Sequence, residues 1–344
     1  MQVTTIGLDL AKHVFQAHGV DAEGRPVLRR RLRRSEVVGF FAGLPACLVG
    51  MEACATAHHW ARELQRLGHR VRLMPPAYVK AYVKRGKTDA ADAEAICEAV
   101  TRPTMRFVPI KTADQQAALV LHRTRDLLVR QRTVLIDALR GHMAEFGIIA
   151  PQGAARIGEL VAEIVAGEAS GPLPQLARQA LLTLVGELQA LGGRIKAVEG
   201  EIMAWHRANE ASRRLATIPG IGPITASAIV AAAPDPTVFR SGRQFAAWIG
   251  LVPRQNSSGG KERLGGISKQ GDRYLRRLLV VGATAVIRHA RTRSDAEGGW
   301  LRGLLGRRPA RLASVALANK TARIAWAVLA RGGAYRKPGV AAAG

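Results

Sequence analysis

The chain has little that would place it outside a cell or in a membrane. It contains only three cysteines in 344 residues, and they lack the paired spacing of a metal site, so a disulfide framework is excluded and a reducing compartment is predicted. No apolar run approaches the roughly 20 residues that cross a bilayer, and no charged-then-apolar leader opens the sequence. We therefore expect a cytoplasmic protein with no membrane partner.

Acidic residues are also scarce. The chain has 26 Asp and Glu against 51 Lys and Arg, which gives a formal net charge of +25. Such an excess attracts phosphate backbones of any sequence, and salt weakens the attraction. A protein of the membrane surface is the competing interpretation of this charge, so the remaining argument depends on where the few carboxylates lie.

Four of those carboxylates stand out in the first hundred residues. Asp9 lies inside an apolar run, Glu52 directly follows another, and Asp89 and Asp92 are spaced to share one face of a helix. Each alone would be an ordinary surface or capping residue. Together, in a strongly basic chain, they predict a Mg²⁺ site, because a few carboxylates plus a substrate phosphate can complete the coordination of this ion. Two such ions commonly catalyse phosphoryl transfer.

The N-terminal part predicts an α/β fold. A helix is expected over residues 57–67 and another over 89–100, the second with Thr88 as its N-cap. Strands are expected over residues 3–10, 14–20, 26–32, 46–51 and 69–74. A meander of three strands followed by strands alternating with helices is the order of a ribonuclease-H-like fold.

Long helices are predicted for the middle of the chain. Residues 114–143 are amphipathic, and after a Gly- and Pro-containing connection (residues 147–175) apolar side chains alternate by three and four over residues 181–205. This seam predicts either a helical hairpin within one chain or a coiled coil between subunits, and the sequence leaves both open. The predicted domains cover residues 1–110, 111–210 and 211–332, followed by a disordered tail over residues 333–344.

A Gly-rich turn over residues 219–223 opens a small-residue helix in the last third of the chain. The pattern resembles a helix-hairpin-helix element, in which glycines let the backbone approach a phosphate. Gly220 and Gly222 are therefore predicted nucleic-acid contacts. A purely structural turn is the alternative, since such turns are common between helices.

A second Gly-rich segment, residues 256–261, contains Ser257 and Ser258 and is followed by a basic helix from about residue 272. Composition alone is typical of a flexible linker. A hydroxyl that attacks a phosphate would also be expected among cations, because their positive charge stabilises the negative charge that develops on the phosphoryl group. The cations predicted to contact nucleic acid here are Arg254, Lys261, Arg263, Lys269 and Arg273.

These motifs together resemble one family across nearly the whole chain. The matching segments are residues 6–12 (IGLDLAK), 50–53 (GMEA), 87–93 (KTDAADA), 218–232, and 245–279 with its SSGG core. In this order they are similar to the DEDD-type transposases of bacterial insertion sequences, whose relatives include pilin-gene invertases and bridge-RNA-guided recombinases.

The resemblance implies a RuvC-like N-terminal domain in which Asp9, Glu52, Asp89 and Asp92 bind Mg²⁺, with Mn²⁺ as a substitute. It assigns an essential serine to Ser258, and the neighbouring Ser257 stays as the alternative. It also implies a coiled coil between the two domains, homodimers or homotetramers on donor and target DNA, a noncoding guide RNA, and a nucleoid-associated protein.

The resulting hypothesis is a site-specific recombinase that excises and inserts its own element, with the serine and the metal-binding carboxylates acting in one composite site. A Mg²⁺-dependent junction resolvase that hydrolyses DNA with water is the first alternative. A nucleic-acid-binding protein without enzymatic activity is the second, and the clustered carboxylates argue against it because they would repel DNA unless a metal neutralised them.

Overall fold

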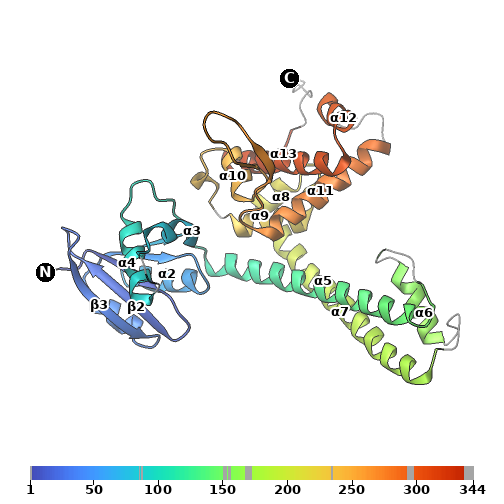
Figure 1. Ribbon diagram of the computed structural model, residues 1–344, viewed down its shortest axis with the longest axis horizontal. Coiled ribbons are helices and arrows are strands. Elements are labelled where there is room, and N and C mark those ends of the chain that lie inside the picture. Colours follow the sequence, from blue (N-terminus) through green and yellow to red (C-terminus); the bar gives the residue numbers. More distant parts are fainter. Residues whose placement is uncertain are drawn as a thin grey trace. The chain divides into compact units, whose positions relative to one another are not determined.

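The computed structural model divides the chain into two compact units, Met1–Gln116 and Ala117–Gly344 (Figure 1). It describes residues 2–84, 86, 88–149, 153, 156–166, 173–233, 235–292 and 298–336. Lys87 of the predicted motif and residues 337–344 of the predicted tail lie outside these ranges. Unit 1 mixes a sheet with helices and unit 2 is mainly helical, which confirms the predicted α/β plus α composition.

Unit 1 is built on a five-stranded sheet with the order β3-β2-β1-β4-β5. The three N-terminal strands form an antiparallel meander, and β4 and β5 extend it in parallel from β1. The strands are β1 (Thr5–Asp9), β2 (Val14–Val20), β3 (Pro26–Arg33), β4 (Leu48–Glu52) and β5 (Arg70–Met74). All five predicted strands are thus present, with their ends displaced by no more than two residues.

The helices of unit 1 are short and pack on both faces of the sheet. They are α1 (Val37–Ala42), α2 (Ala57–Arg66), α3 (Pro76–Val79), the 3-10 turn η1 (Lys80–Tyr82) and α4 (Asp89–Val100). One sheet face forms a core with α1 and α2 in which Phe15, Phe41 and Leu64 are completely buried. Helix α4 covers the other face, and its bounds and Thr88 cap confirm the prediction.

Two glycines of the sheet allow α4 to lie unusually close. A Cβ at Gly7 of β1 would come within 2.2 Å of the Ala93 carbonyl oxygen and 2.4 Å of the Cys97 nitrogen. A Cβ at Gly50 of β4 would come within 2.7 Å of the Val100 side chain. Any larger residue at Gly7 must therefore push the helix backbone away from the sheet.

Replacing Gly7 by Ala is accordingly expected to destabilise unit 1 by roughly 1–3 kcal/mol, because the clash is with backbone atoms that cannot rotate away. Gly39→Ala is the control, since a Cβ at Gly39 in α1 meets nothing within 4 Å. Urea unfolding followed by circular dichroism measures both variants. Equal midpoints for Gly7→Ala and Gly39→Ala would show that the close approach is not needed for stability.

Unit 2 contains two long helices and a bundle of shorter ones. Its helices are α5 (Ala113–Ala144, which begins in unit 1), α6 (Ile157–Ala166), α7 (Gln175–Ala208), α8 (Glu210–Leu215), α9 (Pro223–Ala232), η3 (Pro236–Val238), α10 (Gly242–Trp248), α11 (Arg273–Thr292), α12 (Gly298–Arg307) and α13 (Ala310–Arg331). Two short strands, β6 (Pro253–Gln255) and β7 (Leu264–Ile267), form an antiparallel hairpin. The sequence did not predict α6, which interrupts the segment interpreted as a connection.

Helices α5 and α7 run side by side, with α6 at one end of the pair (Figure 1). Leu139 and Met143 of α5 pack with Leu181 and Val185 of α7, and α6 contributes to the same cluster. Further along, the Arg125 guanidinium of α5 lies 2.7 Å from the Glu199 carboxylate of α7. The predicted apolar seam is therefore largely buried within one chain, as a helical hairpin requires.

The remaining helices of unit 2 share one core, formed mainly by α9, α10, α11 and α13. The turn before α9 is part of this packing, since a Cβ at Gly282 of α11 would come within 1.9 Å of the Gly220 carbonyl oxygen. Gly220 itself has a positive φ of 83°, which favours glycine. In the part of the chain that the structure describes, no helix is long and apolar enough to span a bilayer.

Candidate active site

Two of the predicted carboxylates end neighbouring strands. β1 ends at Asp9 and β4 ends at Glu52, and the parallel register of these strands pairs Gly7 with Gly50. Continued by two residues, the register places Asp9 opposite Glu52 on the face to which both glycines belong, because alternate residues of a strand share a face. Both carboxylates are half-buried.

Helix α4 covers that same face and runs antiparallel to β1. The Cys97 thiol lies 3.8 Å from the Thr5 carbonyl oxygen, whereas Gly7, two residues further along β1, faces both Cys97 and Ala93. Each step toward the end of β1 is thus a step toward the start of α4. The strand end that carries Asp9 is directed to the first turn of the helix.

The first turn of α4 carries the other two carboxylates. The Thr88 hydroxyl caps the helix by accepting a hydrogen bond of 3.2 Å from the Ala91 nitrogen. Asp89 is exposed and Asp92 is half-buried. A cap fixes where a helix begins, so Thr88 determines which residues occupy the turn nearest the sheet edge.

Cys54 shows that Asp9 and Glu52 share one neighbourhood. Cys54 is exposed, yet partial desolvation raises the pKa of its thiol, and the nearby charges of Glu52 and Asp9 raise this pKa further. Among the residues that the structure describes, however, no group of three or more His, Cys, Asp or Glu lies close enough to hold a metal ion. The structure thus pairs Asp9 with Glu52 and does not join Asp89 and Asp92 to them in one ligand group.

The remaining acidic residues of α4 are engaged elsewhere. Glu94 forms an ion pair of 2.5 Å with Lys84, and this hydrogen bond lowers the pKa of its carboxyl group. Glu98 forms an ion pair of 2.8 Å with Arg102. Each of these two carboxylates is therefore engaged by a nearby cation.

The segment with the two serines is an exposed β-hairpin turn in unit 2, not a flexible linker. Gly259 and Gly260 have positive φ angles of 56° and 74°, the combination of a type I′ turn. Ser258 and Lys261 flank this turn, and the backbone nitrogen of Lys261 donates to the Ser258 carbonyl oxygen at 3.1 Å. In Figure 1 the hairpin extends from the helices beside α10.

The base of the hairpin is tightly held. A Cβ at Gly250 would come within 2.2 Å of the Gln270 carbonyl oxygen, and one at Gly271 within 1.9 Å of the Trp248 carbonyl oxygen. The Ser268 nitrogen also donates to the Val252 carbonyl oxygen at 2.8 Å. The turn is therefore exposed, while its attachment to the helical bundle is fixed by backbone packing.

The two serines have different surroundings. The Ser257 hydroxyl accepts a hydrogen bond of 3.2 Å from the backbone nitrogen of Arg263 across the hairpin. The Ser258 hydroxyl makes no hydrogen bond with any residue that the structure describes and is exposed to solvent. Ser257 thus helps to hold the hairpin together, and Ser258 presents a hydroxyl that no backbone group engages.

The predicted cations lie along the hairpin, at its base and at the start of α11. Two of them, Arg254 and Arg263, lie in or beside the hairpin strands, and Lys269 has a positive φ of 56° at its base. All five of the predicted cations are exposed, and within the described ranges none forms an ion pair: Arg254, Lys261, Arg263, Lys269 and Arg273. Their charges are therefore available to a polyanion.

The Gly-rich turn divides into two roles. Gly220 packs against Gly282, so close helix packing accounts for it. Gly222 is exposed, forms the N-cap of α9 without a side-chain hydrogen bond, and has open space at its Cβ position. Of these two residues, Gly222 is the more accessible to a phosphate, and close packing alone accounts for a glycine at position 220.

Sequence reasoning missed the positioning role of Gly7 and Gly50. The signal was present, because each glycine lies two residues before its carboxylate, in Gly7-Leu8-Asp9 and Gly50-Met51-Glu52. Residues two apart on a strand face the same way. A repeated glycine at this spacing therefore predicts that another element lies close to the face that bears the carboxylates.

Carboxylates at the end of a sheet and exposed cations in a strongly basic chain suit an enzyme that acts on a polyanion such as DNA. Comparisons with known proteins specify the class. Residues 6–148 match a family model described as "Transposase" of the DEDD type, and residues 212–297 match the model of the "Transposase IS116/IS110/IS902 family".

Whole-length relatives agree with both matches. The chain is 54% identical to a "Probable family 20 transposase" of Pseudomonas aeruginosa, over 98% of this chain and 99% of the relative. It is 44% identical to the "Transposase for insertion sequence element IS1111A" of Coxiella burnetii, over 97% and 92% of the two chains. It is 43% identical to the "Transposase for insertion sequence element IS1328" of Yersinia enterocolitica, over 97% and 99%.

The chain belongs to the IS116/IS110/IS902 family of insertion-sequence transposases. It is therefore a DNA transposase, as the resemblance of its motifs predicts. Its DEDD-type domain indicates a divalent metal.

Proposed function

We propose that this transposase cuts and rejoins DNA through a covalent phosphoserine formed by Ser258, with Mg²⁺ held by Asp9, Glu52, Asp89 and Asp92. The observation that carries the proposal is the Ser258 hydroxyl, exposed beside a type I′ turn and unengaged among unpaired cations. A retained phosphoester bond is what distinguishes strand joining from simple hydrolysis.

The metal assignment is supported by the chemistry of the donors. Asp9 and Glu52 present hard carboxylate oxygens from one sheet face, and α4 carries Asp89 and Asp92 in its first turn. Carboxylates of this kind are what Mg²⁺ prefers, and Mn²⁺ accepts the same ligands. When bound, such ions activate the attacking oxygen and stabilise the leaving one.

The chain's own residues account for the remaining steps. The Ser258 oxygen forms a bond to phosphorus, its proton passes to solvent, and a deoxyribose oxygen leaves. Arg254, Lys261 and Arg263 stabilise the negative charge that develops on the phosphoryl oxygens. A deoxyribose hydroxyl of the partner strand then displaces the serine, which restores the enzyme and joins the strands.

The topology of unit 1 supports a ribonuclease-H-like, RuvC-like domain. An antiparallel meander extended in parallel by β4 and β5, with carboxylates at the ends of β1 and β4, is the arrangement expected of that fold. We assign this domain to residues 1–110, the helical connection to 111–210 and the serine domain to 211–332. In the serine domain, α8, the glycine turn and α9 form the helix-hairpin-helix-like element.

Oligomers on paired donor and target sites are a further part of the proposal. Helix α5 keeps an apolar stripe at seven-residue spacing, formed by Val120, Leu127 and Val134, which are 57%, 47% and 66% exposed. A stripe with this period is suited to packing against a second helix.

A noncoding guide RNA is proposed from the resemblance to RNA-guided members, and the excess positive charge is compatible with it.

The alternative is a metal-dependent resolvase that hydrolyses DNA with water. It is favoured by the placement of all four carboxylates in unit 1, which would make unit 2 a binding domain only. The two mechanisms differ in one product, because only the serine mechanism attaches DNA to the protein.

The test is to incubate the protein with DNA that flanks its gene, denature it, and search for attached DNA. We expect a protein–DNA adduct that peptide mass spectrometry places on Ser258. Cleaved DNA without any adduct would support hydrolysis instead.

Sequencing the nucleic acid that copurifies with the protein tests the guide RNA. A discrete RNA encoded beside the gene would support it, and a heterogeneous mixture that salt removes would contradict it.

A further inference from the structure

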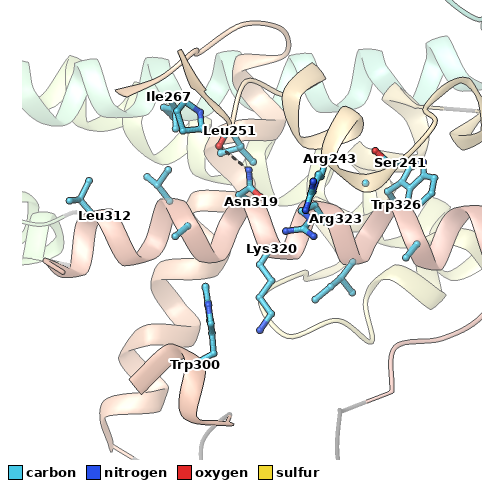
Figure 2. A pocket seen from close by; sticks show the side chains of 16 residues that line it. Ser241, Arg243, Leu251, Ile267, Trp300, Leu312, Asn319, Lys320, Arg323 and Trp326 are labelled. Carbon is cyan, nitrogen blue, oxygen red and sulfur yellow. Dashed lines mark hydrogen bonds between the residues drawn. The ribbon is translucent and has the colours of Figure 1, made fainter. Parts of the chain in front are cut away.

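Unit 2 contains a cavity that the proposed chemistry does not use (Figure 2). It lies among α10, α12, α13 and the base of the β6–β7 hairpin and has a volume of about 1060 Å³. Leu251, Ile267, Leu312 and Ile324 supply apolar lining. Ligand sites in proteins measure about 300–1,000 Å³, so the cavity is large enough to be a ligand site.

The cavity has a strongly positive lining. Arg243, Lys320 and Arg323 line it and are exposed, and none of its lining residues is acidic. In the described part of the chain, none of these three cations forms an ion pair. Uncompensated positive charge at a concave surface favours an anionic ligand.

Two of these cations are held near each other by close helix packing. A Cβ at Gly242 would come within 2.9 Å of the Arg323 carbonyl oxygen, so only a glycine lets the start of α10 approach α13 here. Arg243 directly follows this contact. The fold therefore uses a glycine to bring two guanidinium-bearing residues to one edge of the cavity.

An aromatic surface lies beside the cations. Trp300 of α12 is 45% exposed, and the Lys320 ammonium lies 4.3 Å from the centre of its ring. A lysine side chain is flexible and can move aside for another group. The second tryptophan of the lining, Trp326, is fixed by a hydrogen bond of 3.0 Å from its ring nitrogen to the Pro236 carbonyl oxygen.

A polar group suited to the edge of a base is also present. Asn319 donates from its amide nitrogen to the Leu251 carbonyl oxygen at 3.0 Å, a contact drawn in Figure 2. Its amide oxygen makes no hydrogen bond with the residues that the structure describes. The cavity thus combines cations, an exposed ring and a free acceptor.

We propose that this cavity binds an unpaired nucleotide of a single strand, with the base stacked on Trp300 and the phosphate held by Arg243, Lys320 and Arg323. A cationic groove with an aromatic platform is how proteins bind single strands, and a base inside a duplex has no free face to offer. The inference builds on the proposed function, since strand exchange exposes unpaired DNA and a guide would supply unpaired RNA.

Fluorescence anisotropy of the full-length protein, with EDTA present, tests the proposal on labelled dT12, rU12 and a dT12·dA12 duplex. Trp300→Ala is expected to weaken single-strand binding about 5- to 100-fold, while Trp300→Phe retains most of it. Duplex affinity should change less than about twofold, since phosphate contacts dominate there.

Arg323→Gln should weaken single-strand binding and reduce its salt dependence. Arg311 is exposed on the same helix but lies outside the cavity lining, so Arg311→Gln should have a smaller effect.

The two single strands separate the two sources of the nucleotide. Tighter binding of dT12 assigns the cavity to a DNA strand, and tighter binding of rU12 assigns it to RNA. The proposal is overturned if Trp300→Ala and Arg323→Gln bind single strands as the wild type does, or if they lose duplex and single-strand binding equally. Because no cleavage is needed, failure of the serine mechanism would leave this result unaffected.

Discussion

Ser258→Ala is expected to lower the rate of strand joining by about 10³-fold or more, whereas Ser257→Ala retains most of it. Loss of a nucleophile typically costs about 10³- to 10⁶-fold, and alanine leaves no oxygen to attack phosphorus. The Ser257 hydroxyl instead accepts a hydrogen bond from the Arg263 nitrogen. Its loss should cost about 0.5–1.5 kcal/mol of hairpin stability.

The measurement is recombination of a plasmid that carries the flanking DNA, together with adduct formation on a denaturing gel. Ser257→Ala is the matched control for Ser258→Ala, because the two residues are adjacent, both are exposed and both variants lose the same atom. If Ser257→Ala were the inactive variant, the nucleophile would be displaced by one residue. Undiminished joining by both variants would support hydrolysis by water.

Asn in place of Asp9, Asp89 or Asp92 is expected to lower cleavage about 10²- to 10⁴-fold each. Removing one charged ligand lowers the several kcal/mol of charge stabilisation that a metal supplies. Overall binding of DNA should not weaken, because each change removes a negative charge from a basic protein. Cleavage assays and Mn²⁺ titration followed by electron paramagnetic resonance give two independent measurements.

Glu98→Gln is the matched control for the helix carboxylates. It changes an acid on the same helix, α4, that is exposed and paired with Arg102. We expect near-normal cleavage and metal affinity from this variant. If Asp89→Asn and Asp92→Asn behaved like Glu98→Gln, the metal site would consist of Asp9 and Glu52 with ligands not yet assigned.

Mixing Asp9→Ala protein with Ser258→Ala protein tests whether one subunit can supply the carboxylates and another the serine. Recovered activity in the mixture would support the shared arrangement. Activity in each wild-type control but none in the mixture would restrict both groups to one subunit.

Several elements followed directly from the sequence because their signals are local. The strands that lead to Asp9 and Glu52 are marked by apolar residues, and the cap at Thr88 is read from one residue type before a helix pattern. The family also followed from short motifs in order. The α/β composition of the first unit and the helical composition of the second were predicted for the same reason.

Other features could not be read locally. The hairpin that carries Ser258 has the composition of a linker, and only the pairing of β6 with β7 identifies its glycines as a type I′ turn. The seam on α7 fitted two partners equally well, and packing against α5 buries it within one chain. Gly220 matched a phosphate-binding pattern, yet its contact is with Gly282, which lies far away in the sequence.

The sequence by itself determined the chemistry available to this transposase: which carboxylates, serines and cations it has, and the strands and helices that carry them. Only the tertiary structure decided which of these groups meet. It paired Asp9 with Glu52 through strand register, directed α4 to them through Gly7, and left Ser258 unengaged while engaging Ser257. Periodicity and caps act over a few residues, whereas register and close backbone approach depend on segments that are distant in the chain.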